Sequence, residues 1–153
     1  VVSRVRFMAK ALDCKVIVLD HISILVSAGQ HGDERKALDS IMTKLRTLTQ
    51  DTGVVLFAVS HLKRPEGKAH EEGSATSISQ LRGSASIAQL SDFVIGLERN
   101  GQAEDETERN TTNIRVLKNR FSGITGPAGS VLYNPDTGRL LEYEPADHEE
   151  AAL

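Results

Sequence analysis

Two short apolar runs with an amphipathic segment between them constrain the fold of this chain more than any other feature. Residues 15–25 read Lys-Val-Ile-Val-Leu-Asp-His-Ile-Ser-Ile-Leu, and residues 54–60 read Val-Val-Leu-Phe-Ala-Val-Ser. Both runs are rich in β-branched residues and apolar on both faces, which is typical of parallel strands covered by helices on either side. Residues 33–49 place apolar side chains at helical spacing, with Asp33 positioned to cap the helix. This order predicts a right-handed βαβ unit.

Further elements are predicted before and after this unit. Residues 2–12 carry apolar side chains at helical spacing, and residues 84–90 indicate a short helix. Residues 93–97 form a third predicted strand, and residues 111–117 a fourth, whose alternation is typical of a strand near a sheet edge. The sequence Asn-Pro-Asp-Thr-Gly at 134–138 is a turn signal that predicts a β-hairpin. Together the patterns predict an α/β fold with a mostly parallel sheet flanked by helices and a C-terminal β-hairpin.

Composition excludes several classes of protein. With 39% hydrophobic and 25% charged residues, the 153-residue chain matches soluble globular proteins. No apolar run approaches the roughly 18 residues that a membrane span needs. The single cysteine, Cys14, excludes an internal disulfide framework and a thiolate zinc site. We therefore expect a cytoplasmic or nucleoid-associated protein that does not bind membranes.

Charge is distributed unevenly along the chain. The formal net charge is −3, but from Glu142 onward the sequence holds acidic residues and no Lys or Arg. We expect residues 1–144 to form the globular part and residues 145–153 a disordered acidic tail. Without the acidic end, the body has a small excess of positive charge. That excess does not by itself indicate a nucleic-acid partner, because contact with phosphates requires local clustering of basic groups.

Two polar residues follow the two apolar runs of the βαβ unit. Asp20 comes directly after Val-Ile-Val-Leu, and His61 ends the sequence Ala-Val-Ser-His. Because the carboxyl ends of parallel strands form the ligand-binding edge of an α/β sheet, we expect both residues at one edge. There Asp20 can hold the water shell of a nucleotide-bound Mg²⁺, and His61 can hydrogen-bond a terminal phosphate and report its loss. Taken singly, a strand-end aspartate and a structural histidine are the commoner explanations.

A long polar segment, residues 61–82, follows the second run. It exceeds the length of ordinary connections in compact domains, and such loops are usually functional. Three of its basic residues lie close together: Lys63, Arg64 and Lys68. Side chains of this kind can neutralise phosphates of single-stranded DNA without reading bases. At the end of the loop, Gly83 after Arg82 lets backbone approach a phosphate ahead of a helix start. A solvated loop of mixed charge is the alternative.

Two arginines follow the later predicted strands. Arg99 comes after the third strand, and Arg120 comes after the fourth in Val-Leu-Lys-Asn-Arg. We expect both guanidinium groups at the same sheet edge as Asp20 and His61. An arginine supplied across a subunit boundary can stabilise charge on a transferring γ-phosphoryl group. A surface arginine with no partner is the alternative for each of them.

The ordered set of motifs resembles a known family. The motifs are Leu-Asp-His-Ile-Ser-Ile-Leu, Asp-Glu-Arg-Lys, Ser-His-Leu-Lys, Gly-Lys-Ala-His-Glu-Glu-Gly, Leu-Arg-Gly-Ser, Gln-Leu-Ser-Asp, Leu-Glu-Arg-Asn and Leu-Lys-Asn-Arg-Phe-Ser-Gly. In this order they resemble the carboxy-terminal half of the helicase domain of the primase-helicases of short-tailed phages. Those proteins are related to DnaB-type replicative helicases and to the mitochondrial helicase Twinkle. The resemblance covers residues 10–144 and implies part of a RecA-like P-loop NTPase core.

The resemblance also implies an activity and partners. The family forms a ring of six RecA-like domains that hydrolyses nucleoside triphosphate, ATP or dTTP, to move five-prime to three-prime along single-stranded DNA and part the duplex. By position, Asp20 matches the Walker B carboxylate for Mg²⁺, His61 the γ-phosphate sensor, and Arg120 the arginine finger that reaches the neighbouring subunit. Arg99 and Tyr133 match residues that flank the nucleotide base. Four residues match the DNA loop of the central channel: Lys63, Lys68, Arg82 and Gly83.

The chain departs from the family pattern in three respects. The sequence contains no Gly-x-x-x-x-Gly-Lys-Ser/Thr phosphate loop and no upstream catalytic glutamate, so we expect both to precede Val1 and the chain alone to be inactive. Gly67 stands where a third lysine of the DNA loop is expected. The acidic tail is a short analogue of the tail through which phage helicases contact the replicative DNA polymerase. A RecA-type recombinase core, or a non-catalytic DNA-binding or ring-forming adaptor without a phosphate loop, remains the alternative.

Overall fold

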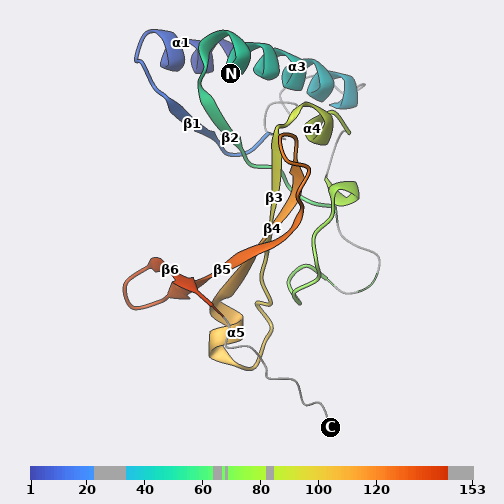
Figure 1. Ribbon diagram of the computed structural model, residues 1–153, viewed down its shortest axis with the longest axis vertical. Helices are drawn as coiled ribbons and strands as arrows, with labels where there is room; N and C mark the ends of the chain where they lie inside the picture. Colours follow the sequence, from blue (N-terminus) through green and yellow to red (C-terminus); the bar gives the residue numbers. More distant parts are fainter. Residues whose placement is uncertain (23–33, 64–66, 68, 82–84, 145–153) are drawn as a thin grey trace. The chain divides into compact units, whose positions relative to one another are not determined.

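The computed structural model in Figure 1 describes residues 1–22, 34–63, 67, 69–81 and 85–144. The chain divides into two compact units. The first unit comprises residues 1–63 and 79–91, and the second comprises residues 64–78 and 92–153. The expected helix cap Asp33 and the expected acidic tail, residues 145–153, lie outside the described residues.

The first unit contains the predicted βαβ arrangement. Its elements are α1 (Val2–Lys10), β1 (Val16–Leu19), α3 (Glu34–Thr52), β2 (Val55–Ala58) and α4 (Ala85–Leu90). β1 and β2 pair in parallel, with Ile17 opposite Leu56 and Leu19 opposite Ala58, and α3 lies between them in the chain. Gly53, with φ of 68°, follows the last residue of α3, a backbone conformation that glycine adopts without strain and that commonly ends helices.

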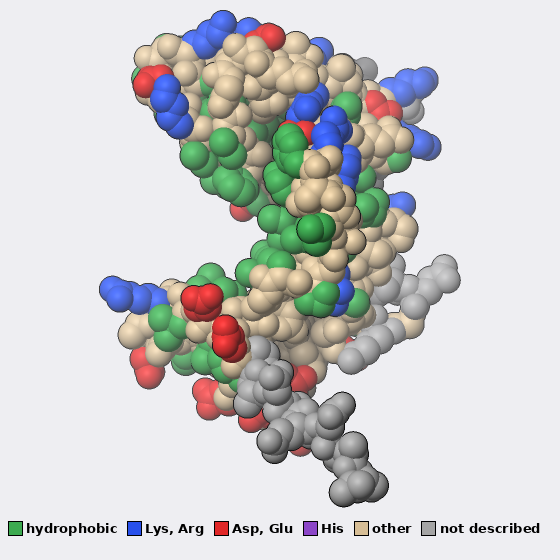
Figure 2. Space-filling model, viewed as in Figure 1, with side chains coloured by type: hydrophobic (Ala, Val, Ile, Leu, Met, Phe, Trp, Pro, Cys, Tyr) green, Lys and Arg blue, Asp and Glu red, His purple; other side chains and the backbone are tan. Residues whose placement is uncertain are grey.

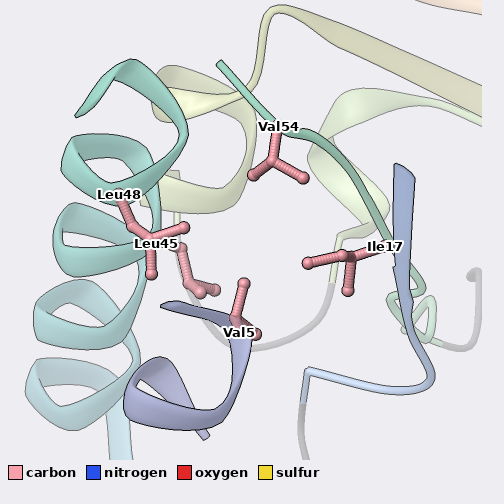
Figure 3. Close-up of a cluster of buried hydrophobic side chains, with 5 residues drawn as sticks. All are labelled: Val5, Ile17, Leu45, Leu48 and Val54. Carbon is pink, nitrogen blue, oxygen red and sulfur yellow. The ribbon is translucent and has the colours of Figure 1, made fainter. Parts of the chain in front are cut away.

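The core of the first unit lies between its helices and its strand pair. Val5 from α1, Leu45 and Leu48 from α3, Ile17 from β1 and Val54 form one buried cluster, drawn in Figure 3. The side chain of Leu48 is fully buried, with 0% of its surface exposed. Truncating a leucine buried to this degree costs about 2–5 kcal/mol, so this cluster fixes the position of the strand pair beneath the helices.

A second cluster of the first unit fixes the segment that follows β1. It contains Ile22, which is 2% exposed, with Leu38 and Met42 of α3 and Ile87 of α4. Because Ile22 is two positions beyond Asp20, its burial holds the carboxyl end of β1 close to α3 and α4. The residues just after the strand are therefore placed by packing.

Only one face of the strand pair is covered by the described helices. Val16, Val18, Val55 and Phe57 point away from the core and are exposed, and Figure 2 shows hydrophobic side chains where β1 and β2 lie below the helices. The expectation of helices on both faces is therefore wrong for the described part of the chain. The apolar pattern of the strands is typical of a sheet buried on both faces, and the described residues cover one of those faces.

The second unit is built around an antiparallel sheet. Its elements are β3 (Phe93–Glu98), α5 (Glu106–Asn110), β4 (Thr111–Asn119), β5 (Gly126–Asn134) and β6 (Arg139–Tyr143), and the strand order is β3-β4-β5-β6. A short 3₁₀ helix, η1 (Ile78–Gln80), spans the boundary between the units. The predicted hairpin is confirmed as β5 and β6, where Asn134 Oδ1 accepts a hydrogen bond of 3.0 Å from the backbone N–H of Thr137.

Two expectations about the sheet are wrong. The described strands form one parallel pair and three antiparallel pairs, so a mostly parallel sheet is not found among them. The connections at 120–125 and 135–138 are too short for the crossover that a parallel pair requires. β4 lies inside the sheet, between β3 and β5, and not at its edge. Its alternation reflects a strand whose faces are both partly exposed.

Among the described residues, no helix is long and apolar enough to cross a membrane.

Candidate functional site

The carboxyl end of the β1–β2 pair brings the first two candidate residues together. The backbone N–H of Val59 donates to the carbonyl of Leu19 at 2.9 Å, and the N–H of Ile22 donates to the carbonyl of Val59 at 2.9 Å. Asp20 lies within the short stretch held by these two bonds, and its side chain is exposed. His61 follows Val59 by two residues on the neighbouring segment. The expectation that both residues lie at the same end of the strand pair is confirmed.

A second histidine contributes to this end of the pair. The rings of His21 and His61 pack with their centroids 4.1 Å apart and an angle of 35° between their planes. His21 is half-buried, and its Nδ1 atom is buried without a hydrogen-bond partner among the described residues. His61 is exposed. The sensor candidate therefore packs its ring against another imidazole and remains exposed to solvent.

The donors at this edge fit a hydrated Mg²⁺ rather than a metal cage. Within the described ranges, no group of three or more His, Cys, Asp or Glu side chains is placed to hold a metal ion. Mg²⁺ keeps several waters and is commonly bound through one or two carboxylates together with substrate phosphates. The exposed carboxylate of Asp20 is a suitable acceptor for such a water shell, and no further carboxylate is needed for that fit.

The two ends of the candidate DNA loop are joined by backbone hydrogen bonding. Leu62 and Leu81 form an isolated antiparallel bridge, and the backbone N–H of Lys63 donates to the carbonyl of Gln80 at 2.7 Å. Lys63 is exposed at the first foot of the loop. Four of the predicted DNA-contacting residues lie outside the described residues: Arg64, Lys68, Arg82 and Gly83.

The two candidate base contacts lie at one end of the antiparallel sheet. The guanidinium group of Arg99 donates to the carbonyl of Arg109 at 2.7 Å and to Asn110 Oδ1 at 3.1 Å, at the start of β4. Tyr133, which is half-buried, follows Leu132, the partner of Thr111 at that same end of β4. The structure therefore brings Arg99 and Tyr133 to one end of the sheet.

Arg120 lies at the other end of this sheet. Its backbone N–H donates to the carbonyl of Asp92, which precedes β3, and its Nε atom lies 3.4 Å from Asp92 Oδ1. The expectation that Arg99 and Arg120 share a sheet edge is wrong. β3 and β4 run antiparallel, so the residue after β3 and the residue after β4 are separated by the length of the strands, roughly 20 Å.

A buried carboxylate joins the segment 69–78 to the antiparallel sheet. Glu98 Oε1 accepts from the backbone N–H of Thr76 at 2.7 Å, from Thr76 Oγ1 at 2.8 Å and from Arg115 Nε at 2.7 Å. Arg115 Nη2 donates to Glu98 Oε2 at 3.3 Å. Glu98 is 7% exposed. We call Thr76, Glu98 and Arg115 the Glu98 network.

The surroundings of Glu98 change its ionisation. Burial by itself raises the pKa of Glu98, but hydrogen bonds from Arg115 and Thr76, with the charge of Arg115, outweigh that effect and hold the pKa below its usual value. The same hydrogen bond raises the pKa of Arg115. The network is therefore an ion pair at neutral pH.

Comparison with known proteins identifies the family. Residues 1–139 match the family described as the DnaB-like helicase C terminal domain. The chain belongs to this family. It is also 53% identical over 139 residues to the DNA helicase/primase of Enterobacteria phage T3, an alignment that covers 90% of this chain and 24% of that protein.

More distant members of the DnaB-like family match over a similar range. The chain is 29% identical over 118 residues to the replicative DNA helicase DnaC of Bacillus subtilis, which covers 76% of this chain and 25% of that protein. It is 28% identical over 117 residues to the replicative DNA helicase DnaB of Treponema pallidum, covering 76% of this chain and 23% of that protein. The chain spans about a quarter of the length of the curated relatives it matches.

Solved structures place the DnaB-like chain in the RecA-like fold class. A DnaB-like replicative helicase, solved in a study of its interactions with primase, superposes with a TM-score of 0.75 at 19% identity over 94% of this chain and 35% of that one. A KaiC-like protein of Pyrococcus horikoshii gives a TM-score of 0.63 at 17% identity over 94% of this chain and 55% of that one. The predicted α/β RecA-like fold is confirmed.

Sequence reasoning missed two polar residues of this DnaB-like chain. His21 lies between Asp20 and the buried Ile22. Its place just beyond the apolar run, next to Asp20, is the signal in the sequence that could have indicated it. Glu98 lies directly after the strand predicted at residues 93–97, and nothing in the sequence around it indicates that a charged side chain there is buried. Only the pairing of β3 with β4, which brings Arg115 alongside, explains why a carboxylate is buried there.

Proposed function

We propose that the protein carrying this chain is a replicative DNA helicase. It couples hydrolysis of a nucleoside triphosphate, ATP or dTTP, to five-prime to three-prime movement along single-stranded DNA and separation of the duplex. The observation that carries the proposal is the convergence of Asp20 and His61 at the carboxyl end of one parallel strand pair, in a chain of the DnaB-like family. Residues 1–144 form the carboxy-terminal part of the motor domain.

The nucleotide site is assigned to this end of the strand pair. Asp20 would hold a Mg²⁺ through the ion's water shell, and the ion would supply neutralisation of phosphate charge during phosphoryl transfer. His61 donates a hydrogen bond to the terminal phosphate and loses that contact when the phosphate leaves. The packed ring of His21 restricts the orientations of His61, so the sensing imidazole is held in place before the nucleotide binds.

The role proposed for Arg120 implies a ring of subunits. Arg99 and Tyr133 flank a nucleotide base at one end of the antiparallel sheet, while Arg120 stands at the opposite end. With Arg99 at the base, Arg120 is assigned to the terminal phosphate as the arginine finger that the family resemblance implies. Such a finger serves the site of a neighbouring subunit, which fits a homo-hexamer with nucleotide sites at subunit interfaces.

The DNA loop supplies the contact with single-stranded DNA. Lys63, Lys68 and the basic residues near them neutralise backbone phosphates, a contact that depends on charge and not on base sequence. The protein acts at the replication fork in the cytoplasm of a phage-infected bacterial cell, where the acidic end of the chain offers a contact for the replicative DNA polymerase. The 153-residue chain alone does not hydrolyse nucleotide, because its sequence contains no phosphate loop.

Nucleotide hydrolysis by the full-length protein tests the proposal. Single-stranded DNA should stimulate hydrolysis, and a forked duplex should be unwound from its five-prime tail. Asp20→Asn should lower the hydrolysis rate by about 10²-fold or more, because the metal's charge stabilisation amounts to several kcal/mol. Asp51→Asn is the matched control, since Asp51 is an exposed carboxylate near the amino end of β2. Equal rates for the two variants, or no DNA-dependent hydrolysis, would remove the assignment.

A further inference from the structure

We propose that the Glu98 network is a positioning device that makes single-stranded DNA binding and nucleotide binding depend on each other. It holds the downstream arm of the DNA loop, residues 69–78, against the strand end that carries Arg99. The inference rests on the proposed helicase function and adds a role for three residues that no part of that function requires. Glu98, Thr76 and Arg115 are positioning residues and touch neither nucleotide nor DNA.

The hydrogen bonds of Glu98 are divided between the sheet and the loop arm. Two of them come from Arg115 on β4, which would suffice to join two neighbouring strands. The other two come from the backbone and hydroxyl of Thr76 on the loop arm. A carboxylate that is 7% exposed and shared in this way fixes the arm to the sheet, since losing either set of donors leaves a buried charge short of partners.

Close packing at Gly96 holds the arm at the same place. A side chain at Gly96 would place its Cβ atom 2.0 Å from Thr76 Oγ1 and 3.0 Å from Thr76 Cβ, closer than real contacts allow. The backbone of β3 therefore accepts Thr76 only because residue 96 has no side chain. This contact is independent of the hydrogen bonds and fixes the same residue of the loop arm.

The two residues on either side of Arg99 both contact the loop arm. Glu98 binds Thr76, and Asn100 forms a β-bridge with Glu72. Between them Arg99 points to the start of β4, where it binds the carbonyl of Arg109. The residue assigned to the nucleotide base is thus flanked on both sides by residues that hold the loop arm. Any shift of Arg99 that accompanies base binding is transmitted to the arm through its two chain neighbours.

The test measures how nucleotide changes single-stranded DNA affinity in the full-length protein. Dissociation constants for a fluorescent oligonucleotide are measured with and without a non-hydrolysable nucleoside triphosphate, and their ratio is the coupling between the sites. Thr76→Val keeps the shape of the side chain and removes its hydroxyl donor. We expect this variant to reduce the ratio by between about twofold and tenfold, the equivalent of one hydrogen bond.

Three further variants make the result specific. Thr76→Ser keeps the hydroxyl and should restore the wild-type ratio. Gly96→Ala keeps every polar group but displaces Thr76, and it should reduce the ratio in the same direction. Thr43→Val is the matched control, because it makes the same change at an exposed position of α3, where the lost hydrogen bond of 2.9 Å goes to the carbonyl of Asp39 and involves no residue of the Glu98 network. It should leave the ratio unchanged.

The outcomes separate this inference from the proposed function. A ratio in Thr76→Val and Gly96→Ala equal to that of Thr43→Val would overturn the inference. So would an equal loss of affinity with and without nucleotide, because that is the effect of a purely structural contact. If the wild-type protein bound no single-stranded DNA, or bound it identically with and without nucleotide, the proposed function would fail together with the inference.

Discussion

At the scale of single residues, Glu98 shows how a chain can bury a charge. Its carboxylate is out of water but has two donors from Thr76 and two from Arg115. Burial of an ionised group is unfavourable unless its oxygens are hydrogen-bonded, and here the donors outweigh the loss of solvent, since the pKa lies below its usual value. The ionised form is thus the one that fits the folded protein.

The lowered pKa of Glu98 predicts an acid-dependent loss of stability. The contribution of Glu98 is fully present above the unfolded-state value, about 4.5, and is lost as the pH falls through the lower folded-state pKa. In urea unfolding of the full-length protein, the free energy of unfolding should therefore decline as the pH is lowered from about 6 to about 3. The substitution Glu98→Gln should make this decline smaller. An identical decline in the variant would show that other carboxylates account for it.

Arg120 carries the residue-scale prediction about catalysis. In the full-length protein, Arg120→Ala should abolish DNA-stimulated hydrolysis, a loss of about 10³-fold or more, and leave nucleotide binding largely intact. The reason is that a finger stabilises charge that develops in the transition state and not in the bound ground state. Arg139→Ala, at an exposed position at the start of β6, is the control. Unchanged turnover in Arg120→Ala would remove the finger assignment.

At the scale of elements, the loop between β2 and α4 carries a prediction of its own. Lys63→Ala and Lys68→Ala should weaken single-stranded DNA binding, and each should reduce the slope of log affinity against log salt concentration by about 0.7. Lys44→Ala, at an exposed position on α3, is the matched control. If the slope in the lysine variants equalled that of the control, the DNA contact would have to be assigned to another element.

Local patterns predicted the elements of the chain better than their pairing. The apolar runs and helical spacing gave β1, α3 and β2 because these are properties of neighbouring residues. The direction of β4 relative to β3 depends on how the chain returns after Glu98, which no periodicity reports. For this reason Arg99 and Arg120 were expected at one edge and lie at opposite ends.

Some residues of the candidate site could be predicted from the sequence and others could not. Asp20 and His61 were found from the sequence, because a parallel pair brings the residues after each strand to one end. His21 and Glu98 were not, because their significance depends on partners far along the chain, His61 and Thr76. A pattern read along the sequence identifies positions at strand ends but does not show which buried polar residues meet.

At the scale of the whole molecule, the account depends on sites shared between subunits. The first unit offers Asp20 and His61 at the end of its strand pair. The second unit offers Arg99 and Arg120 at opposite ends of its sheet. In the proposed ring of copies, each subunit supplies Arg120 to the site of the next.

A structure of the full-length protein with a non-hydrolysable nucleoside triphosphate, Mg²⁺ and single-stranded DNA tests the central claim most directly. We predict that a metal-bound water lies within hydrogen-bond distance, roughly 3 Å, of the Asp20 carboxylate, with His61 at the terminal phosphate and the neighbouring subunit's copy of Arg120 facing it. A triphosphate bound away from the carboxyl end of β1 and β2 would contradict the account.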